Sequence, residues 1–439
     1  MRSDRGTIFP KSFDVAAVTR SCGLVLLWTG VAGLHSTTHG GVSGGIAFPR
    51  DTMTQGLLQA APTPRASGEA ALASDAPMVS MRPGTPAGGR MFETLQEQAA
   101  SESKPADDAT GKPDDAGAEN APAADEITPA LEESVRRGFE YLRRQQKPEG
   151  CFGQGRFAEH IGVTSLCAIA FLADGNVPGR GEFGDCVRKA LDFVLDHSTE
   201  TGLLVSDETH GPMYGHGFAT LFLGEIYGMN QEDDRVRDAL VRAVQLIVSS
   251  QNDEGGWRYN PVPNDADVSV TICEVMGLRS ARNAGVKVPK STIDDAIAYV
   301  RACQNPDGGF RYMKDIGTSG WPRTAAGVAS LFYAGVYEDD SIDRGLDYIR
   351  NTAFPRGVAG RGAAYAQPHY FYGHYYAVQA MYLAGGSRWR EWWPAIRDEL
   401  IARQNPDGSW SDSQGDAYGT AMALIILQMP KRYLPIFQR

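Results

Sequence analysis

The chain has 439 residues, of which 42% are hydrophobic, and a formal net charge of −11. The negative charge and the lack of a Lys/Arg stripe with interleaved aromatic residues argue against a nucleic-acid partner. Only the part after about residue 128 has sustained helical periodicity, and that part is long enough to bury a large core.

The first 35 residues have the pattern of a signal peptide or N-terminal anchor. Basic residues precede an apolar run from Gly23 to Leu34, and about 12 apolar residues do not comfortably span a bilayer. We therefore expect export to the periplasm or cell envelope, with membrane association through an uncleaved leader as the alternative. Residues 36–127 are rich in Ala, Pro, Gly, Ser and Asp, which predicts a disordered tether.

The predicted folded domain runs from residue 128 to 439. Thr128 is a suitable N-cap, and Pro129 suits the first position of a helix. We expect six helical hairpins and almost no strand. Each hairpin has an outer helix with a half-apolar stripe, a Gly turn, and an inner helix that is apolar nearly all round. The turns fall at Gly150, Gly202, Gly255, Gly308, residues 357–362 and Gly408.

Three of these turns share one sequence pattern. Residues 251–259 (QNDEGGWRY) recur as residues 304–312 (QNPDGGFRY) and, in shorter form, as residues 404–410 (QNPDGSW). A recurrence every 50 or so residues is typical of stacked supersecondary units. We interpret the repeated Gln and aromatic residues as clamps between units, namely Gln251, Trp257, Gln304, Phe310, Gln404 and Trp410.

Hairpins two and five lack this pattern and share a different one. Tyr214-Gly215-His216 recurs as Tyr372-Gly373-His374. Its spacing of 158 residues equals the spacing of Gln146 and Gln304, which indicates a duplicated set of three hairpins.

The Gln-x-x-x-Gly-x-aromatic turns resemble the QW repeats of the prenyltransferase and squalene-oxidase repeat superfamily, over roughly residue 128 to the C-terminus. The resemblance implies an all-α (α/α)6 toroid with an apolar central cavity. It also implies a terpenoid-cyclase-like or isoprenoid-processing function with an isoprenoid-like small molecule as ligand. The alternative is a non-catalytic exported toroid that binds a lipid, a glycan or a protein.

Five inner helices share a Thr, and the remaining one is aligned with them by its Tyr-Gly-His copy. The position one turn earlier, near each helix N-terminus, is polar in five of the six helices. We expect these positions to form a ring at one mouth of the barrel, in which neighbouring hairpins pair His216 with Asp267 and His374 with Asp416. Each pair suits either an oriented acid or base or a structural hydrogen bond, and both Asp residues also suit N-caps. The ring positions are His160, His216, Asp267, Gly320, His374 and Asp416.

Asp265-Ala266-Asp267 is similar to the Asp-x-Asp-Asp run of class II terpene cyclases, whose middle acid donates a proton to an alkene or epoxide. The resemblance makes Asp267 the leading catalytic acid and Asp265 its supporting carboxylate, although Val268 replaces the last Asp. The zinc-binding Asp-x-Cys of prenyltransferases is not matched, because Ser269 replaces the thiolate. We expect no zinc and no other cofactor; a metal held by His160, His216 and Asp267 is the alternative.

Aromatic residues cluster near the same predicted mouth. Aromatic faces stabilise carbocations and hold polyisoprenoid chains, but they also serve as packing. The candidate cavity residues are Tyr214, Phe218, Trp321, Tyr372, Tyr376 and Tyr418.

Five of the six cysteines follow the leader, without CxxC spacing and mostly inside helical patterns. This pattern favours buried free thiols over a disulfide framework.

Overall fold

The computed structural model of the protein describes residues 125–206, 211–355 and 369–438. These residues form twelve α-helices and no strand, only isolated β-bridges, which confirms the all-α prediction. The predicted signal segment, nearly all of the predicted tether and the turn at residues 357–362 lie outside the described residues. None of the described helices has the length and apolar composition needed to cross a membrane.

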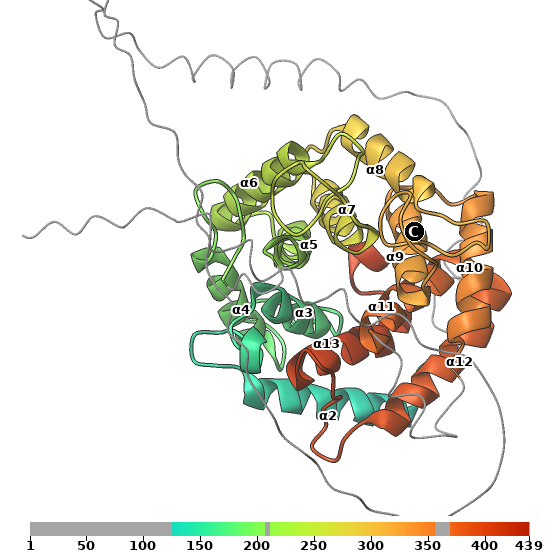
Figure 1. The fold of residues 1–439 in the computed structure, drawn as a ribbon. Coiled ribbons are helices and arrows are strands. Elements are labelled where there is room, and N and C mark those ends of the chain that lie inside the picture. The colour runs from blue at the N-terminus through green and yellow to red at the C-terminus, as the bar shows by residue number, and fades with distance from the viewer. Residues whose placement is uncertain (1–124, 207–210, 356–368, 439) are drawn as a thin grey trace, which may run out of the picture. The chain divides into compact units, whose positions relative to one another are not determined.

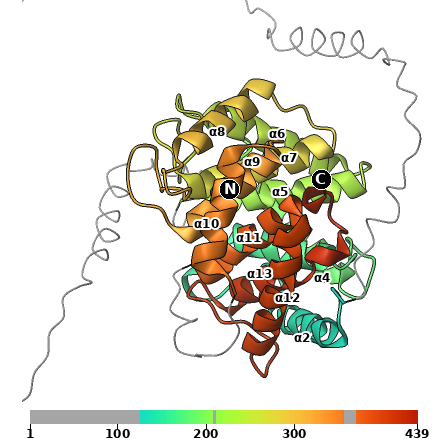
Figure 2. The ribbon, with the colours of Figure 1, turned by 90° about the vertical axis from the view of Figure 1, so that its right-hand side faces the viewer.

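Six inner helices form a closed ring that six outer helices surround (Figure 1). Each inner helix packs against the one before it and the one after it, and α13 packs against α3 to close the ring. Figure 2 views the same ring from the side of α10 and α12. The inner helices are α3 (Ile161–Leu172), α5 (Met213–Met229), α7 (Val268–Asn283), α9 (Trp321–Tyr333), α11 (Tyr370–Ala384) and α13 (Asp416–Leu427). The outer helices are α2 (Pro129–Gln145), α4 (Gly184–Asp196), α6 (Asp234–Ser250), α8 (Lys290–Ala302), α10 (Asp340–Ala353) and α12 (Gly386–Arg403).

The two classes of helix differ in the way that the sequence predicts. Every residue of α3 is buried, as an apolar helix inside a ring requires, whereas α6 buries one stripe that includes Val236, Leu240 and Ile247. Outer helices also pack on the inner helix that precedes them in the ring. Helix α4 packs on α3, α10 packs on α9, and α2 packs on α13. These outer helices therefore pack more closely on the inner helix before them in the ring than on the inner helix of their own predicted hairpin.

The N-terminus of the toroid lies slightly before the predicted boundary. Thr128 is the N-cap of α2, and its hydroxyl accepts a hydrogen bond from the Leu131 amide at 3.2 Å. The two residues 125–126, which we had assigned to the tether, bind the side of α12. Trp389 donates to the Glu126 carboxylate at 2.6 Å, and Arg397 donates to the Asp125 carbonyl at 2.7 Å.

The repeated Gln residues clamp each turn to the next outer helix, which confirms their structural interpretation. The Gln251 side-chain amide donates to the carbonyl of its own turn, at Gly255, and to the carbonyl of Thr292 in α8, at 2.8 and 2.9 Å. The same pair of bonds is made by Gln146 to Gly150 and Cys186, by Gln304 to Gly308 and Ser341, and by Gln404 to Gly408 and Ser134. The last of these joins the final turn to α2.

The turn glycines are required by both conformation and space. Gly255 has a φ of +95°, and a Cβ built on it would lie 2.2 Å from the Asp295 carbonyl oxygen of α8. The turn glycines at positions 150, 202, 308 and 408 also have positive φ, and a Cβ on each would crowd a carbonyl of the neighbouring outer helix. Glycine thus lets each turn lie directly against the next helix.

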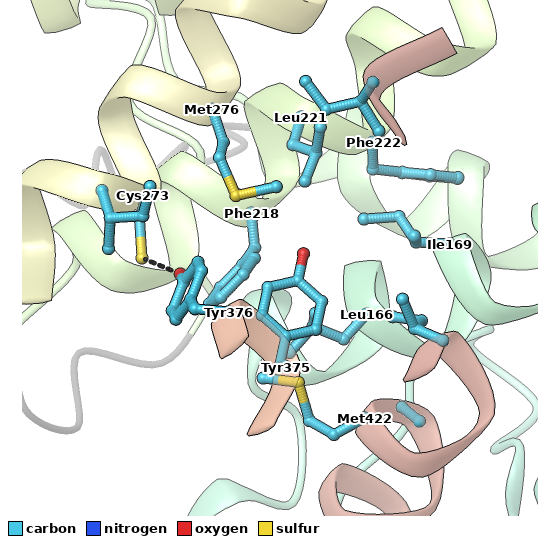
Figure 3. Close-up of a cluster of buried hydrophobic side chains, with 14 of the residues drawn as sticks. Leu166, Ile169, Phe218, Leu221, Phe222, Cys273, Met276, Tyr375, Tyr376 and Met422 are labelled. Atoms are coloured by element: carbon cyan, nitrogen blue, oxygen red, sulfur yellow. Dashed lines mark hydrogen bonds between the residues drawn. The ribbon is translucent and has the colours of Figure 1, made fainter. Parts of the chain in front are cut away.

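The centre of the ring is filled by side chains (Figure 3). They point toward one another from five inner helices, and none exposes more than 6% of its surface. The predicted apolar cavity therefore does not run through the barrel as an open channel. The labelled members are Leu166, Ile169, Phe218, Leu221, Phe222, Cys273, Met276, Tyr375, Tyr376 and Met422.

The end of the barrel at the inner-helix C-termini is covered by the last residues of the chain. Leu434, Ile436 and Phe437 are buried there, and the 3-10 turn Pro435–Phe437 packs on α7. The Ile436 amide donates to the buried carboxylate of Glu225, which also accepts from Ser280. Burial raises the pKa of Glu225 to about 7. The five described cysteines are buried free thiols, as predicted.

We predict that Gly255→Ala destabilises the protein far more than Gly175→Ala. Both glycines have φ near +90°, but a Cβ at Gly175 meets nothing within 4 Å. Gly175→Ala should therefore cost only the backbone strain, about 1–2 kcal/mol, whereas Gly255→Ala must also push its turn off α8. Urea unfolding of both variants tests this, and equal losses of unfolding free energy would contradict the turn-to-helix contact.

Candidate functional site

Asp267 stands at the start of α7 and is completely buried. One carboxylate oxygen caps the helix, accepting from the amides of Ser269 at 2.8 Å and Val270 at 3.0 Å. The other oxygen accepts from the Tyr312 hydroxyl at 3.0 Å and lies 3.6 Å from Nε of Arg258. The carboxyl group is therefore an N-cap and, through its second oxygen, also part of a polar side-chain cluster.

Asp267 takes up a proton more readily than an exposed Asp does. Burial raises its pKa from the ordinary 3.8 to about 6, because the carboxylate loses water. The Val270 amide, the Tyr312 hydroxyl and the Arg258 guanidinium each lower the pKa and offset part of this effect. A carboxyl group with such a pKa holds a proton in mildly acidic solution, where an exposed Asp does not.

Arg258 organises the cluster around this carboxyl. It forms an ion pair with Asp265, and its guanidinium lies 4.9 Å from the ring centroid of Tyr259 and 5.9 Å from that of Tyr312. The Tyr259 and Tyr312 hydroxyls are hydrogen-bonded to each other. Asp265 is 49% exposed and supports Asp267 only through Arg258.

The predicted pair of His216 with Asp267 is wrong, because both ring nitrogens of His216 bind backbone groups. Its Nδ1 accepts from the Leu204 amide at 3.1 Å, and its Nε2 lies 3.3 Å from the Ala243 carbonyl. In the repeats that keep a turn aromatic, the equivalent amide donates to the shared Thr. In hairpin two the hydroxyl of Thr220 is buried without a partner. His216 has taken over this role, and burial lowers its pKa to about 4.

His374 lies in an aromatic pocket and does not pair with Asp416 as predicted. Its ring centroid is 4.4 Å from that of Tyr370, 4.9 Å from that of Trp321 and 5.8 Å from that of Trp392. Its Nδ1 has no hydrogen-bond partner. Burial lowers its pKa to about 3, so this imidazole is neutral at any ordinary pH.

Asp416 is not an N-cap, in contrast to the prediction. Gly415 is the N-cap of α13, so Asp416 is the first helical residue and its amide donates to the Gln154 side chain at 2.7 Å. The N-cap of α13 lies five residues before the shared Thr420, whereas the N-cap of α7 lies four residues before Thr271. Because of that extra residue, Asp416 lies within the first turn of α13 and does not take the cap position that Asp267 has.

The predicted metal set is not assembled. His160 caps α3, with its Nδ1 accepting from the Gly162 amide at 3.1 Å, and the nitrogens of His216 are bound as described. Across the described ranges, no three His, Cys, Asp or Glu residues are grouped to hold an ion.

Four of the predicted cavity aromatics keep partly exposed surface, whereas Phe218 and Tyr376 belong to the filled centre. The Tyr372 hydroxyl of α11 reaches the Ser269 carbonyl of α7 at 3.4 Å. Burial raises the pKa of both Tyr214 and Tyr372 well above its usual value, and the charge of Asp267 raises both further. The ring centroid of Tyr214 lies 6.1 Å from that of Tyr259, so both tyrosines border the Asp267 cluster. The partly exposed aromatics are Tyr214, Trp321, Tyr372 and Tyr418.

The prenyltransferase alpha-alpha toroid domain model matches residues 121–203 and 190–365, which is more than half of the chain. The chain belongs to this family. The chain is 27% identical to a drimenyl diphosphate synthase of Streptomyces showdoensis over 178 residues, 40% of this chain. It spans only 31% of that relative's length, and 35% of a second synthase, from Streptantibioticus cattleyicolor.

Solved structures support the toroid fold alone. The type II terpene cyclase MstE from Scytonema superposes with a TM-score of 0.50 and 15% identity, covering 70% of this chain and 99% of that one. A D-mannose isomerase superposes with a TM-score of 0.51 and 12% identity, covering 70% of this chain and 98% of that one. The same fold thus occurs in proteins of unrelated chemistry.

Three residues of the Asp267 cluster were not among the sequence candidates. Arg258, Tyr259 and Tyr312 belong to repeated turns, and we had interpreted those turns as clamps. The available signal was the dipeptide Arg-Tyr, which follows the turn aromatic at Trp257 and at Phe310 but is Ser-Asp after Trp410. If Arg-Tyr were part of the clamp, we would expect it in every copy of the turn. Its presence in only two copies indicates a separate role.

We predict that Asp267→Asn removes a pH dependence of stability between about pH 4 and 6. In this window the folded protein keeps a proton on Asp267 that the unfolded chain, with the ordinary pKa of 3.8, has released. Rising pH therefore favours unfolding, by roughly 3 kcal/mol in total at most, and the dependence levels off above pH 6. Urea unfolding across this window should therefore show the wild type losing stability relative to the variant as the pH rises.

The matched control for this measurement is Asp416→Asn, which makes the same change at a partly exposed carboxyl. The Asn side chain keeps the capping oxygen of Asp267, so the helix cap should survive. An Asp267→Asn difference that does not change with pH would show that burial does not hold a proton on this carboxyl.

Proposed function

We propose that this protein is a class II terpene-cyclase-like enzyme, in which Asp267 protonates a double bond of a linear isoprenoid. The observation that carries the proposal is a fully buried carboxyl group whose pKa burial raises to about 6, in a cluster bordered by Tyr214 and Tyr372. Structural N-caps are usually ionised and exposed at a helix end, whereas a proton donor needs the environment that Asp267 has.

The chemistry follows from a single proton transfer. The Asp267 proton forms a new C–H bond with one alkene carbon, and the other carbon becomes a cation that neighbouring double bonds of the same chain can attack. The electron-rich faces of Tyr214, Trp321 and Tyr372 suit stabilisation of the cations. Loss of a proton to water ends the sequence, so the product is an isomer of the substrate and no cofactor takes part.

The filled centre supports a site at one end of the barrel. Side chains such as Phe218 and Tyr376 would form its floor, and the C-terminal segment covers the opposite end. A linear isoprenoid would therefore enter and leave by the mouth near Asp267. We further propose that residues 1–35 direct export, with the toroid acting in the periplasm or at the cell envelope.

The drimenyl diphosphate synthases bring the isoprenoid class into consideration, although the chain spans only about a third of their length. The alternative is a non-catalytic toroid that binds an apolar ligand at the same mouth. In that case Asp267 would be a buried N-cap, and its replacement would leave ligand binding intact.

We predict that Asp267→Asn abolishes turnover of a linear isoprenoid without unfolding the protein. Farnesyl diphosphate, geranylgeranyl diphosphate and squalene are suitable probes, and mass spectrometry detects cyclised isomers after chromatography. Loss of the acid should lower turnover by at least about 1,000-fold, while Asp416→Asn should retain most of it. An Asp267→Asn protein that still cyclises the probe would end the proposal, and binding of a probe without turnover by the wild type would favour the alternative.

We predict further that kcat/KM of the wild type falls with rising pH. The reactive form carries the proton, so kcat/KM should be constant below the pKa of about 6 and decline tenfold per pH unit above it. A rate that instead rises through this range would assign Asp267 as a base.

A further inference from the structure

The dipeptide Arg-Tyr occurs in two turns that meet at Asp267. Arg258-Tyr259 comes from the turn before α7, and Arg311-Tyr312 comes from the turn before α9. The clamps between units do not use these tyrosines, because they are made by the Gln side chains and the turn carbonyls. At the equivalent place after Trp410 the chain has Ser411-Asp412, and no buried carboxyl cap follows it. One tyrosine thus reaches the Asp267 cluster from the turn before α7 itself and the other from the turn before α9.

The two hydroxyl groups form a continuous hydrogen-bonded chain to the acid. Tyr312 donates to the outer oxygen of Asp267 at 3.0 Å, and the Tyr259 hydroxyl is hydrogen-bonded to that of Tyr312. Asp267 has no exposed surface, whereas Tyr259 and Tyr312 are both partly exposed. A hydrogen-bonded chain therefore leads from the buried Asp267 through Tyr312 to Tyr259.

We propose that Tyr312 and Tyr259 relay a proton from water to Asp267 after each turnover. The inference rests on the proposed role of Asp267 as the acid, which becomes a carboxylate when the substrate takes its proton. The Tyr312 hydroxyl proton then moves to the carboxylate, the Tyr259 hydroxyl proton moves to the Tyr312 oxygen, and Tyr259 takes a proton from water. One proton enters and both tyrosines end as neutral phenols, so no charge is left in the chain.

Arg258 and Asp265 act as positioning residues in this arrangement. The Arg258 guanidinium lies over both tyrosine rings, which restricts their rotation and keeps the hydroxyls in register. Asp265 fixes Arg258 through the ion pair. This gives the first Asp of the Asp265-Ala266-Asp267 run a role that does not require contact with the acid.

The decisive variant is Tyr259→Phe, which keeps the ring under Arg258 and removes one hydroxyl of the chain. With a probe that the wild type cyclises, the variant should complete its first turnover at the wild-type rate and then slow at least tenfold. Rapid-quench kinetics should therefore show a burst of one product per enzyme. Tyr227→Phe, at the far end of α5, is the matched control and should show neither change. Unchanged steady-state turnover in Tyr259→Phe would overturn the relay.

A second measurement needs no substrate and separates the relay from the proposed function. The carbonyl stretch of protonated Asp267, identified as the infrared band missing from Asp267→Asn, reports its protonation directly. After a rapid pH drop from 8 to 5, this band should appear at least tenfold more slowly in Tyr259→Phe than in the wild type. Equal rates would overturn the relay even if the enzyme turns over. A slowed band in a protein that converts no isoprenoid would retain the relay and end the cyclase proposal.

Discussion

The toroid depends on one repeated contact, in which a glycine turn lies against the backbone of the next outer helix. At Gly255 and its equivalents there is no room for a Cβ. In four of the units a Gln also bridges the turn and the next outer helix with two hydrogen bonds, as Gln251 does. The contact fixes both the distance and the angle between successive units. Six such angles must add up to a closed ring, so small errors at each turn would leave α13 unable to meet α3. The position of Asp267 at the mouth follows from this geometry, because its loop is anchored at the Gly255 turn.

Much of the fold is readable from the sequence because its signals are local. The Gln, Gly and aromatic positions identify the turns. Helices such as α3, which are apolar nearly all round, identify the inner ring, and Thr128 marks the start of the first helix. The sequence does not reveal the filled centre, since an apolar inner helix looks the same beside a cavity and beside another side chain. The cover formed by Leu434, Ile436 and Phe437 also depends on contacts between distant parts of the chain.

The candidate site is predictable only in part, because sequence spacing gives the depth of a residue along a helix but not its direction. Spacing placed His216 and Asp267 at similar depth, yet His216 faces backbone groups of its own turn and of α6. Asp416 differs from Asp267 through a single residue in the helix start. Asp267 is both a helix cap and a member of the side-chain cluster. The structure shows this because one carboxylate oxygen accepts from the helix amides and the other accepts from Tyr312. The role of Arg258 was not predicted, because it lies in a repeated turn and repeated turns are usually structural.

The closure of the ring has a consequence for how the chain folds. Most clamps join neighbouring units, but Gln404 binds the Ser134 carbonyl, which lies 270 residues earlier in the sequence. Such a contact carries a large loop-closure entropy and cannot form until nearly the whole domain has left the ribosome. During synthesis the face of α2 that later contacts α13 therefore stays exposed to solvent. Until α13 is made, the growing chain resembles an open solenoid. An open solenoid tolerates the loss of a terminal unit. In the closed ring, removing any unit exposes the packed faces of both neighbouring units. The toroid should consequently fold and unfold as one cooperative body and not unit by unit.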